Sequence, residues 1–344
     1  MIHSLPRGAE GPAPAGGLDQ ADLHLRPAQG LDVEGQEDQK LVTVAPRNRF
    51  PARMGDTSDY RVPTIDGLLR RALARGPDGG LSLTLDPRFQ GLPDTAHGGT
   101  VLAAFDALAE VPGPRRLRGT YRKRVPLEVP LRLEVSRAGD GVDCRLSDQS
   151  ATLLADGRVE PVAHDDRSAG GAGHRPALSP LPVSTTCFAC GVDNAIGLQV
   201  RLGFDETAVG GTWAPREPFR TEDGWLASAA LTALLDETAF GLGALASGES
   251  GMTTELAVDL RGPLPFGPPL VVHGRREAVR PRGEDARYWD TEVVATDAAG
   301  APVASARITF VAVRGAARRL VNGLLAMNPP EVVGRVFPAY TRPA

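Results

Sequence analysis

The chain has 344 residues, of which 42% are hydrophobic, and its formal net charge at pH 7 is -4. This length suits one large or two medium hydrophobic cores, because single cores stop growing near about 250–300 residues. The slightly acidic balance provides no basic surface for a nucleic-acid backbone, so we expect no nucleic-acid partner. Three cysteines cannot form a fully paired disulfide set, and the sequence shows neither a secretion signal nor an apolar run of about 20 residues. We therefore expect a cytoplasmic protein that does not enter a membrane.

Two stretches of the chain lack the pattern of a packed core. Residues 1 to 60 are rich in Gly, Pro, Ala, Gln and Asp and follow neither a helical nor a strand period, which predicts a disordered leader. Residues 164 to 182, "HDDRSAGGAGHRPALSPLP", have the composition of a linker between domains. These breaks predict one domain at residues 61 to 163 and a second at residues 183 to 344.

The two predicted domains repeat one plan, in which a long apolar helix is followed by several strands. The helices are predicted at residues 97 to 111 and 225 to 245. Both are apolar around their whole circumference, so both should be buried. The pattern predicts an internally duplicated α+β fold in which a pseudo-twofold axis sets the two helices side by side. The predicted strands lie at residues 81 to 89, 117 to 127, 131 to 137, 142 to 147 and 150 to 163 in the first copy, and at 197 to 204, 208 to 215, 253 to 265, 269 to 279, 287 to 297 and 302 to 313 in the second.

The first helix opens on His97, Gly98 and Gly99. A glycine inside a helix costs about 1 kcal/mol relative to alanine, so two of them favour a close approach of another group to the backbone. The first N–H groups of a helix have no acceptor within the helix and lie at the positive end of its dipole. We predict that this turn forms an oxyanion hole, with His97 at the cap position orienting a ligand carbonyl. The alternative is that the glycines only permit a tight turn and His97 only caps the helix.

Sliding the two helices over each other aligns Asp106, in "AAFDALA", with Asp236, in "ALLDETA". Within one helix, His97 and Asp106 would point to opposite sides and lie about 13 Å apart. A pseudo-twofold axis would instead bring the start of the first helix beside Asp236 and Glu237, while a mirror site would combine residues 227 to 229 with Asp106. A buried acid in such a place is typical of a general base or nucleophile. The alternative is an acid that only pins a neighbouring backbone.

Two motifs resemble those of a known family. "HGGTVLAAFD", residues 97 to 106, resembles the His-Gly-Gly motif, with Asp nine residues after the His, of hotdog-fold acyl-CoA thioesterases of the phenylacetyl-CoA thioesterase type. "CFACGVDNAIGLQVRLGF", residues 187 to 204, resembles the Cys-x-x-Cys-Gly-x-x-Asn-x-x-Gly-Leu opening before the first strand in that superfamily. The resemblance covers about residues 80 to 315. It implies two tandem hotdog domains, each an antiparallel sheet wrapped around a long central helix.

The resemblance also implies roles for particular residues. The Gly98 amide would polarise a thioester carbonyl, and Asp236 from the opposite copy would attack that carbonyl or activate water. The substrate would be an acyl-CoA, with no cofactor beyond the coenzyme A moiety of the substrate, and we expect a homo-oligomer of double-hotdog units. The second copy has Ala227 and Ser228 in place of His-Gly, so at most one site matches the pattern. Two other functions stay open: a non-catalytic acyl-CoA-binding protein, and a hotdog dehydratase or hydratase.

A short basic run follows the first helix. Arg122, Lys123 and Arg124 are candidates to bind coenzyme A phosphates through charge-assisted hydrogen bonds. The alternative is that they form the solvated face of an edge strand.

The cysteines offer a further set of candidate ligands. The sequence contains four residues of the types that bind zinc: Cys187 and Cys190, with His164 and His174 upstream. A second Cys-x-x-Cys is missing and both histidines lie in the predicted linker, so we expect no metal.

Overall fold

The computed structural model describes residues 63–76, 79–163, 178–285, 287–323 and 325–340. The predicted disordered leader at residues 1 to 60, and residues 164 to 177 of the predicted linker with its two histidines, lie outside these ranges. The last part of that linker contains Ser179–Pro180, which forms strand β9 and pairs with strand β10 (Gly203–Phe204). The limits of the two predicted domains stay predictions.

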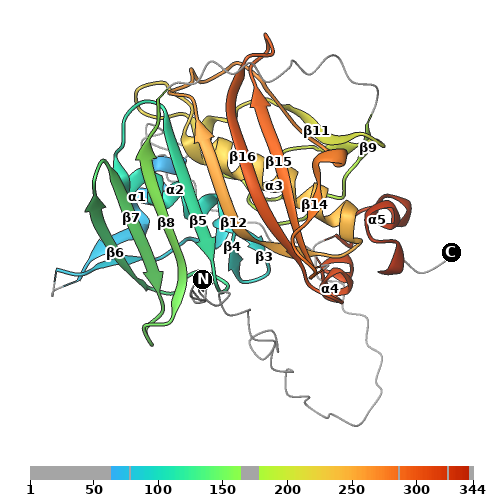
Figure 1. Cartoon of the computed structure of the whole chain (residues 1–344), viewed down its shortest axis with the longest axis horizontal. Helices are drawn as coiled ribbons and strands as arrows, with labels where there is room; N and C mark the ends of the chain where they lie inside the picture. Colours follow the sequence, from blue (N-terminus) through green and yellow to red (C-terminus); the bar gives the residue numbers. More distant parts are fainter. Residues whose placement is uncertain (1–62, 77–78, 164–177, 286, 324, 341–344) are drawn as a thin grey trace, which may run out of the picture. The chain divides into compact units, whose positions relative to one another are not determined.

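All the strands except one short pair form a single antiparallel sheet (Figure 1). Strands β5 and β12 pair at its centre, with Leu117 opposite Val258. Outward from β5 the order is β8, β7, β6, β2 and β1, and outward from β12 it is β16, β15, β13, β11, β10 and β9. The first half contains β1 (Leu73–Arg75), β2 (Leu81–Leu83), β5 (Arg115–Tyr121), β6 (Leu131–Ala138), β7 (Gly141–Ser147) and β8 (Leu153–Pro161), besides the separate pair β3 (Gln90–Leu92) and β4 (Thr95–Ala96). The second half contains β11 (Ala208–Trp213), β12 (Gly251–Leu260), β13 (Leu270–Arg275), β14 (Arg280–Pro281), β15 (Tyr288–Thr296) and β16 (Pro302–Ala312), besides β9 and β10.

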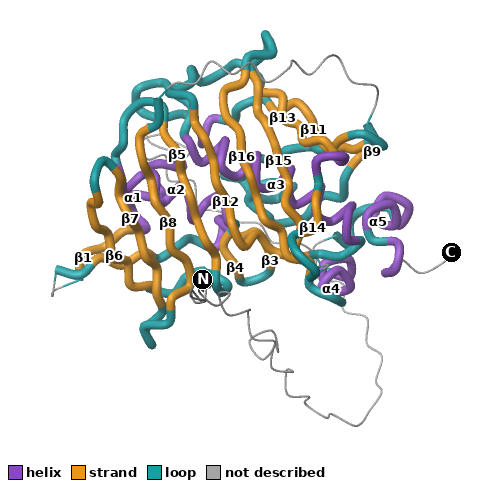
Figure 2. The backbone as a smooth tube through the Cα atoms, in the orientation of Figure 1, coloured by secondary structure: helices purple, strands orange, loops and turns teal. Residues whose placement is uncertain are grey.

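Each half of the sheet packs against one buried helix, as the sequence predicts (Figure 2). Helix α2 (Gly98–Ala109) contacts β5, β7 and β8, and helix α3 (Ser228–Ser247) contacts β12, β13, β15 and β16. Val101 to Phe105 are at most 1% exposed, because the helix has no polar face to offer to water. The observed α+β arrangement of a sheet wrapped around central helices confirms the predicted fold class.

Helices α2 and α3 lie side by side and run in opposite directions. The Thr232 hydroxyl donates to the carbonyl oxygen of Gly99 at 2.8 Å. A Cβ atom at Gly99 would lie 2.6 Å from both the Cα of Ala233 and the carbonyl oxygen of Thr232. Gly99 is therefore required by the close packing of the two helices, which confirms the predicted contact between them.

Helix α3 has the length and apolar composition of a membrane-spanning segment, although most of it is buried inside the protein. The sequence shows no such uninterrupted run, because Asp236 and Glu237 divide it. A core helix under a sheet is apolar for the same reason as a membrane helix, since neither surrounding solvates polar groups.

Two predicted strands are shorter in the structure, and some helical segments were not predicted. Of the predicted strand at 81 to 89 only Leu81–Leu83 is extended, and Pro87–Phe89 forms a 3₁₀ turn because the Asp86 side chain accepts the Arg88 N–H. Only Gly203–Phe204 of the predicted strand at 197 to 204 pairs in the sheet. Helix α1 (Ile65–Ala72) lies where Leu68, Leu69 and Leu73 recur at helical spacing, whereas no pattern predicted the helical segments near the C-terminus: α4 (Ala316–Asn322), α5 (Pro330–Val336) and the 3₁₀ turn Pro338–Tyr340.

Candidate active site

The first turn of α2 forms one side of the site. His97 is the N-cap residue of the helix and is 5% exposed. The Tyr121 hydroxyl, at the end of β5, donates to the carbonyl oxygen of Gly98 at 2.7 Å and holds this peptide in place. Among the residues that the structure describes, none accepts a hydrogen bond from the Gly98 N–H. This amide therefore remains available to a ligand.

Asp236 reaches this turn from α3. Its Oδ2 atom accepts the Gly99 N–H at 2.9 Å and lies 3.3 Å from His97 Nδ1, while its Oδ1 atom accepts the Thr253 hydroxyl at 2.6 Å. A Cβ atom at Gly98 would lie 2.8 Å from Asp236 Oδ2. Gly98 thus makes room for the acid, whereas the Gly99 amide is already used by it. The predicted oxyanion hole is reduced to the amide of Gly98.

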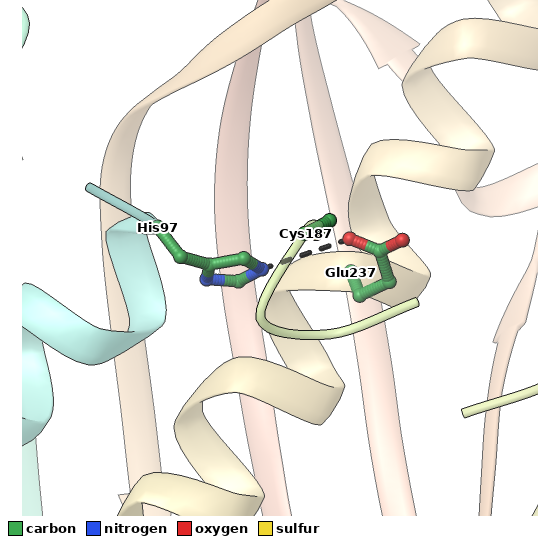
Figure 3. A group of neighbouring side chains, drawn as sticks. All are labelled: His97, Cys187 and Glu237. Carbon is green, nitrogen blue, oxygen red and sulfur yellow. Dashed lines mark ion pairs between the residues drawn. The ribbon is translucent and has the colours of Figure 1, made fainter. Parts of the chain in front are cut away.

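Glu237 completes the polar side of the site, with its Oε2 atom 3.6 Å from His97 Nε2 (Figure 3). Burial, the largest influence, opposes a charge on His97, but the hydrogen bond to Glu237 and the negative charge of Asp236 outweigh it and raise the pKa of His97 to about 9. A protonated ring donates from both nitrogens. The Gly99 N–H, which lies 3.2 Å from His97 Nδ1, therefore donates to Asp236 rather than to the ring.

The turn at Cys187 and Cys190 lies against the same histidine. Cys187 is 5% exposed, and ligand atoms of Cys187, His97 and Glu237 all lie within 4.8 Å of one another (Figure 3). A hydrogen bond from the Cys190 thiol lowers the pKa of Cys187, with the charge of His97 acting in the same direction. The same hydrogen bond, together with burial, raises the pKa of Cys190. The sequence analysis paired these cysteines with His164 and His174, and missed the contact with His97.

The polar groups open into an apolar cavity of about 140 Å³. His97, Gly98, Asp236 and Glu237 line one end. The rest is lined by side chains from three separate parts of the chain: Leu181, Val183 and Leu202 before β11, Phe240 and Ala244 on α3, and Leu320, Leu325, Val336 and Phe337 near the C-terminus. An apolar group bound there would have its polar end at the start of α2.

Basic residues also line this cavity. Lys123 and Arg124 lie on its wall, whereas Arg122 forms an ion pair with Asp156 at 3.0 Å. The basic run lies just beyond β5, which ends at Tyr121, and not on the strand as predicted. Within the described part of the chain the buried Nε atom of Arg124 has no hydrogen-bond partner, and burial lowers the pKa of this side chain. Lys123 and Arg124 are thus placed to meet an anionic ligand.

The mirror position holds the other acid in a different environment. Asp106 accepts two hydrogen bonds from Arg115, at 2.6 and 2.7 Å, and a third from the Ser228 hydroxyl at 2.6 Å. Asp106 is 6% exposed and does not line the cavity. The structure therefore brings together His97, Gly98, Gly99, Asp236 and Glu237, and it leaves Asp106 in a closed contact.

Two residues that contact the site, Tyr121 and Thr253, were missed by the sequence analysis. Both lie on strands that follow a helix, where Tyr and Thr are common for reasons of strand packing.

No protein-family model matches the sequence, and no curated protein matches it. Solved structures do resemble the chain. It is similar to a thioesterase II candidate from Thermobifida fusca YX, with 16% identity and a TM-score of 0.52 over 72% of this chain and 97% of that one. It is also similar to a thioesterase candidate from Novosphingobium aromaticivorans, with 19% identity and a TM-score of 0.51 over 70% and 98% of the two chains. For the acyl-CoA thioesterase II TesB2 from Mycobacterium marinum the identity is 14% and the TM-score 0.51, over 73% and 98%.

At sequence identities this low, the similarity to these structures shows the fold alone. Each of the three chains is matched over nearly its whole length. The protein therefore has the hotdog fold, as its motifs predicted.

Proposed function

We propose that the protein hydrolyses acyl-CoA thioesters at the site between α2 and α3. The observation that carries the proposal is the Gly98 amide, which has no acceptor among the described residues, lines an apolar cavity and lies beside a carboxylate from the opposite helix. An amide held in this way stabilises the negative charge that develops on a carbonyl oxygen during attack. The names of the structural neighbours agree with this function.

In the proposed reaction the acyl group occupies the apolar cavity and the thioester carbonyl accepts the Gly98 N–H. Asp236 acts in one of two ways. As a base it takes a proton from water, the hydroxide adds to the carbonyl carbon, and the carbon–sulfur bond breaks to release coenzyme A and the free acid. As a nucleophile it adds to the carbonyl carbon, the carbon–sulfur bond breaks to release the coenzyme A thiolate, and water hydrolyses the resulting acyl anhydride to the free acid and the Asp236 carboxylate, with a proton passing to the thiolate. Tyr121 holds the Gly98 peptide in place, and Lys123 and Arg124 meet the phosphates of coenzyme A.

One observation favours a second candidate, an acyl-CoA-binding protein without turnover. Both oxygens of Asp236 already accept hydrogen bonds, one from the Gly99 N–H and one from the Thr253 hydroxyl. Attack by this carboxylate on a carbonyl carbon therefore requires one of these two hydrogen bonds to lengthen.

A cytoplasmic location and assembly into a homo-oligomer remain part of the proposal.

Release of free thiol from a panel of acyl-CoAs, measured with the full chain at steady state, tests the proposal. We expect turnover of substrates with apolar acyl groups, and its loss in the Asp236→Asn variant. Saturable binding without thiol release would favour the acyl-CoA-binding protein. Interconversion of enoyl-CoA and hydroxyacyl-CoA without thiol release would instead identify a hydratase or dehydratase.

A further inference from the structure

The Cys-x-x-Cys segment, residues 187 to 190, is a tightly bonded turn. The Ala189 N–H donates to Cys187 Sγ at 3.3 Å, and the Gly191 N–H donates to the Cys187 carbonyl oxygen at 2.9 Å. A Cβ atom at position 191 would lie 2.3 Å from that oxygen, so the turn requires glycine there. An N–H directed at sulfur favours the thiolate form, which is the form that binds metals. The backbone of this turn therefore prepares Cys187 as a ligand.

Three side chains from three segments converge beside this turn. His97 comes from the start of α2, Glu237 from α3, and Cys187 lies between them (Figure 3). Their ligand atoms lie within 4.8 Å of one another, and His97 Nε2 is 3.6 Å from Glu237 Oε2. The Cys190 thiol is in contact with both Cys187 and Glu237. The side chains of His97, Cys187 and Glu237 thus share a small volume at the wall of the cavity, and the Cys190 thiol lies beside it.

We propose that His97, Cys187, Cys190 and Glu237 bind one zinc ion. Two thiolates, an imidazole and a carboxylate are ligand types that zinc accepts in tetrahedral sites. Zinc bonds of ordinary length place neighbouring ligand atoms about 3.3–3.8 Å apart in a tetrahedron, a range that includes the observed separation of His97 Nε2 and Glu237 Oε2. The ligand atoms of His97, Cys187 and Glu237 need only to draw closer around the ion, the Cys190 thiol has to turn toward them, and binding displaces the protons of the ligands.

The surroundings of the four residues fit a metal site. A histidine that binds a metal through one ring nitrogen generally donates from the other to a carboxylate, which fixes the ring. Asp236 Oδ2 lies 3.3 Å from His97 Nδ1, the nitrogen that faces away from Glu237. The third cysteine, Cys144, belongs to no such group among the described residues, and burial raises its pKa to about 12.

Zinc at this position would connect the two halves of the molecule. His97 belongs to the first half of the fold, while Glu237 and both cysteines belong to the second. The ion would fix the orientation of the His97 ring and so the start of α2. This inference goes beyond the proposed reaction, since metal binding can be measured whether or not the protein hydrolyses a thioester.

Metal content tests the proposal directly. The full chain, produced with zinc and dialysed against metal-free buffer, should retain close to one zinc per chain by plasma mass spectrometry. Replacement by Co²⁺ should give the near-ultraviolet thiolate-to-cobalt band and the intense visible bands of a tetrahedral site. Removal of the metal by a chelator should lower the melting temperature. A chain without stoichiometric metal and without the cobalt bands would overturn the proposal, as would a disulfide between Cys187 and Cys190 in the purified protein.

Variants identify the ligands. Cys187→Ser and Cys190→Ser should each lose the zinc or weaken its binding at least about tenfold, the size of effect expected even for partners of the ligands. Cys144→Ala, the matched control, should keep both zinc and the cobalt spectrum. Equal zinc retention in all three variants would contradict the assignment. Because a ligand variant can fail to fold, the cobalt spectrum of the unchanged sequence decides the question by itself.

Discussion

Asp236 and Asp106 lie at corresponding places on α3 and α2, and each contacts the first turn of the opposite helix. Asp106 is held by the guanidinium of Arg115, whereas Asp236 has the uncharged hydroxyl of Thr253. Asp106 also meets the side chain of Ser228, whereas Asp236 meets glycines. Asp106 is therefore neutralised in a buried ion pair, whereas Asp236 borders a cavity.

The two helices also differ in length. Helix α2 has 12 residues and ends at Ala109, followed by the C-cap residue Glu110, which adopts a left-handed backbone conformation with φ of 50°. Helix α3 has 20 residues and continues through Phe240 and Ala244, which line the cavity. Two acids at corresponding places on two helices can therefore differ in role, one making a structural contact and the other bordering a cavity. This difference can be tested by exchanging or removing its parts.

The largest expected effect concerns the acid at the cavity. Asp236→Asn should lower kcat/KM for the best acyl-CoA by about 10²–10⁴-fold, because it removes the negative charge beside the Gly98 amide. Asp106→Asn is the matched control and should leave the activity per folded molecule near that of the unchanged chain. The comparison would be wrong if Asp106→Asn were inactive and Asp236→Asn active.

The second prediction concerns stability, where the order of the two acids reverses. Asp106→Asn should lower the free energy of unfolding by about 3–5 kcal/mol, because it leaves the mostly buried Arg115 without its partner. Asp236→Asn should cost less, since the cation beside it, His97, keeps Glu237 as a partner. Replacing both partners, as in Asp106→Leu with Arg115→Met, should recover much of the loss. Urea titration measures all three, and equal losses for the two single variants would contradict the assignment of Asp106 to a structural ion pair.

The two neighbouring glycines should separate activity from stability. A Cβ atom at Gly98 meets Asp236 Oδ2, so Gly98→Ala should displace the acid and lower kcat/KM by roughly tenfold to a hundredfold. A Cβ atom at Gly99 meets the backbone of α3, so Gly99→Ala should lower the free energy of unfolding by about 1–3 kcal/mol. Kinetics and thermal melting of both variants check this. A Gly98→Ala variant with full activity would remove Gly98 from the site.

The smallest effect is expected from Tyr121→Phe, which removes the hydroxyl that donates to the Gly98 carbonyl oxygen. The loss of one such hydrogen bond is worth about 0.5–1.5 kcal/mol, so kcat/KM should fall by roughly twofold to tenfold. The mirror helix offers a control in Ser228→Ala, which removes a hydrogen bond of Asp106 and should leave kcat/KM unchanged. A larger kinetic effect for Ser228→Ala than for Tyr121→Phe would contradict the comparison.

Much of the fold and part of the site followed from pattern. The apolar circumference of both helices predicted their burial, and the alignment of Asp106 with Asp236 predicted which acid faces His97. The alignment left the environments of the two acids undetermined, because Arg115 and Thr253 belong to strands whose register only the sheet defines. The use of the Gly99 amide by Asp236 also escaped prediction, since it depends on how closely the helices approach.

The sequence by itself determined the periodic features of this protein: two apolar helices and the strands after each. These features follow from local spacing, because the spacing of apolar residues along the chain predicts whether one face of an element or a whole helix is buried. Only the tertiary structure decided which groups meet at the site. Cys187 lies 90 positions after His97, and the cavity takes its wall from residues as far apart as Gly91 and Phe337. Such contacts depend on how the two helices and the segments around them pack together, which no pattern of neighbouring residues predicts.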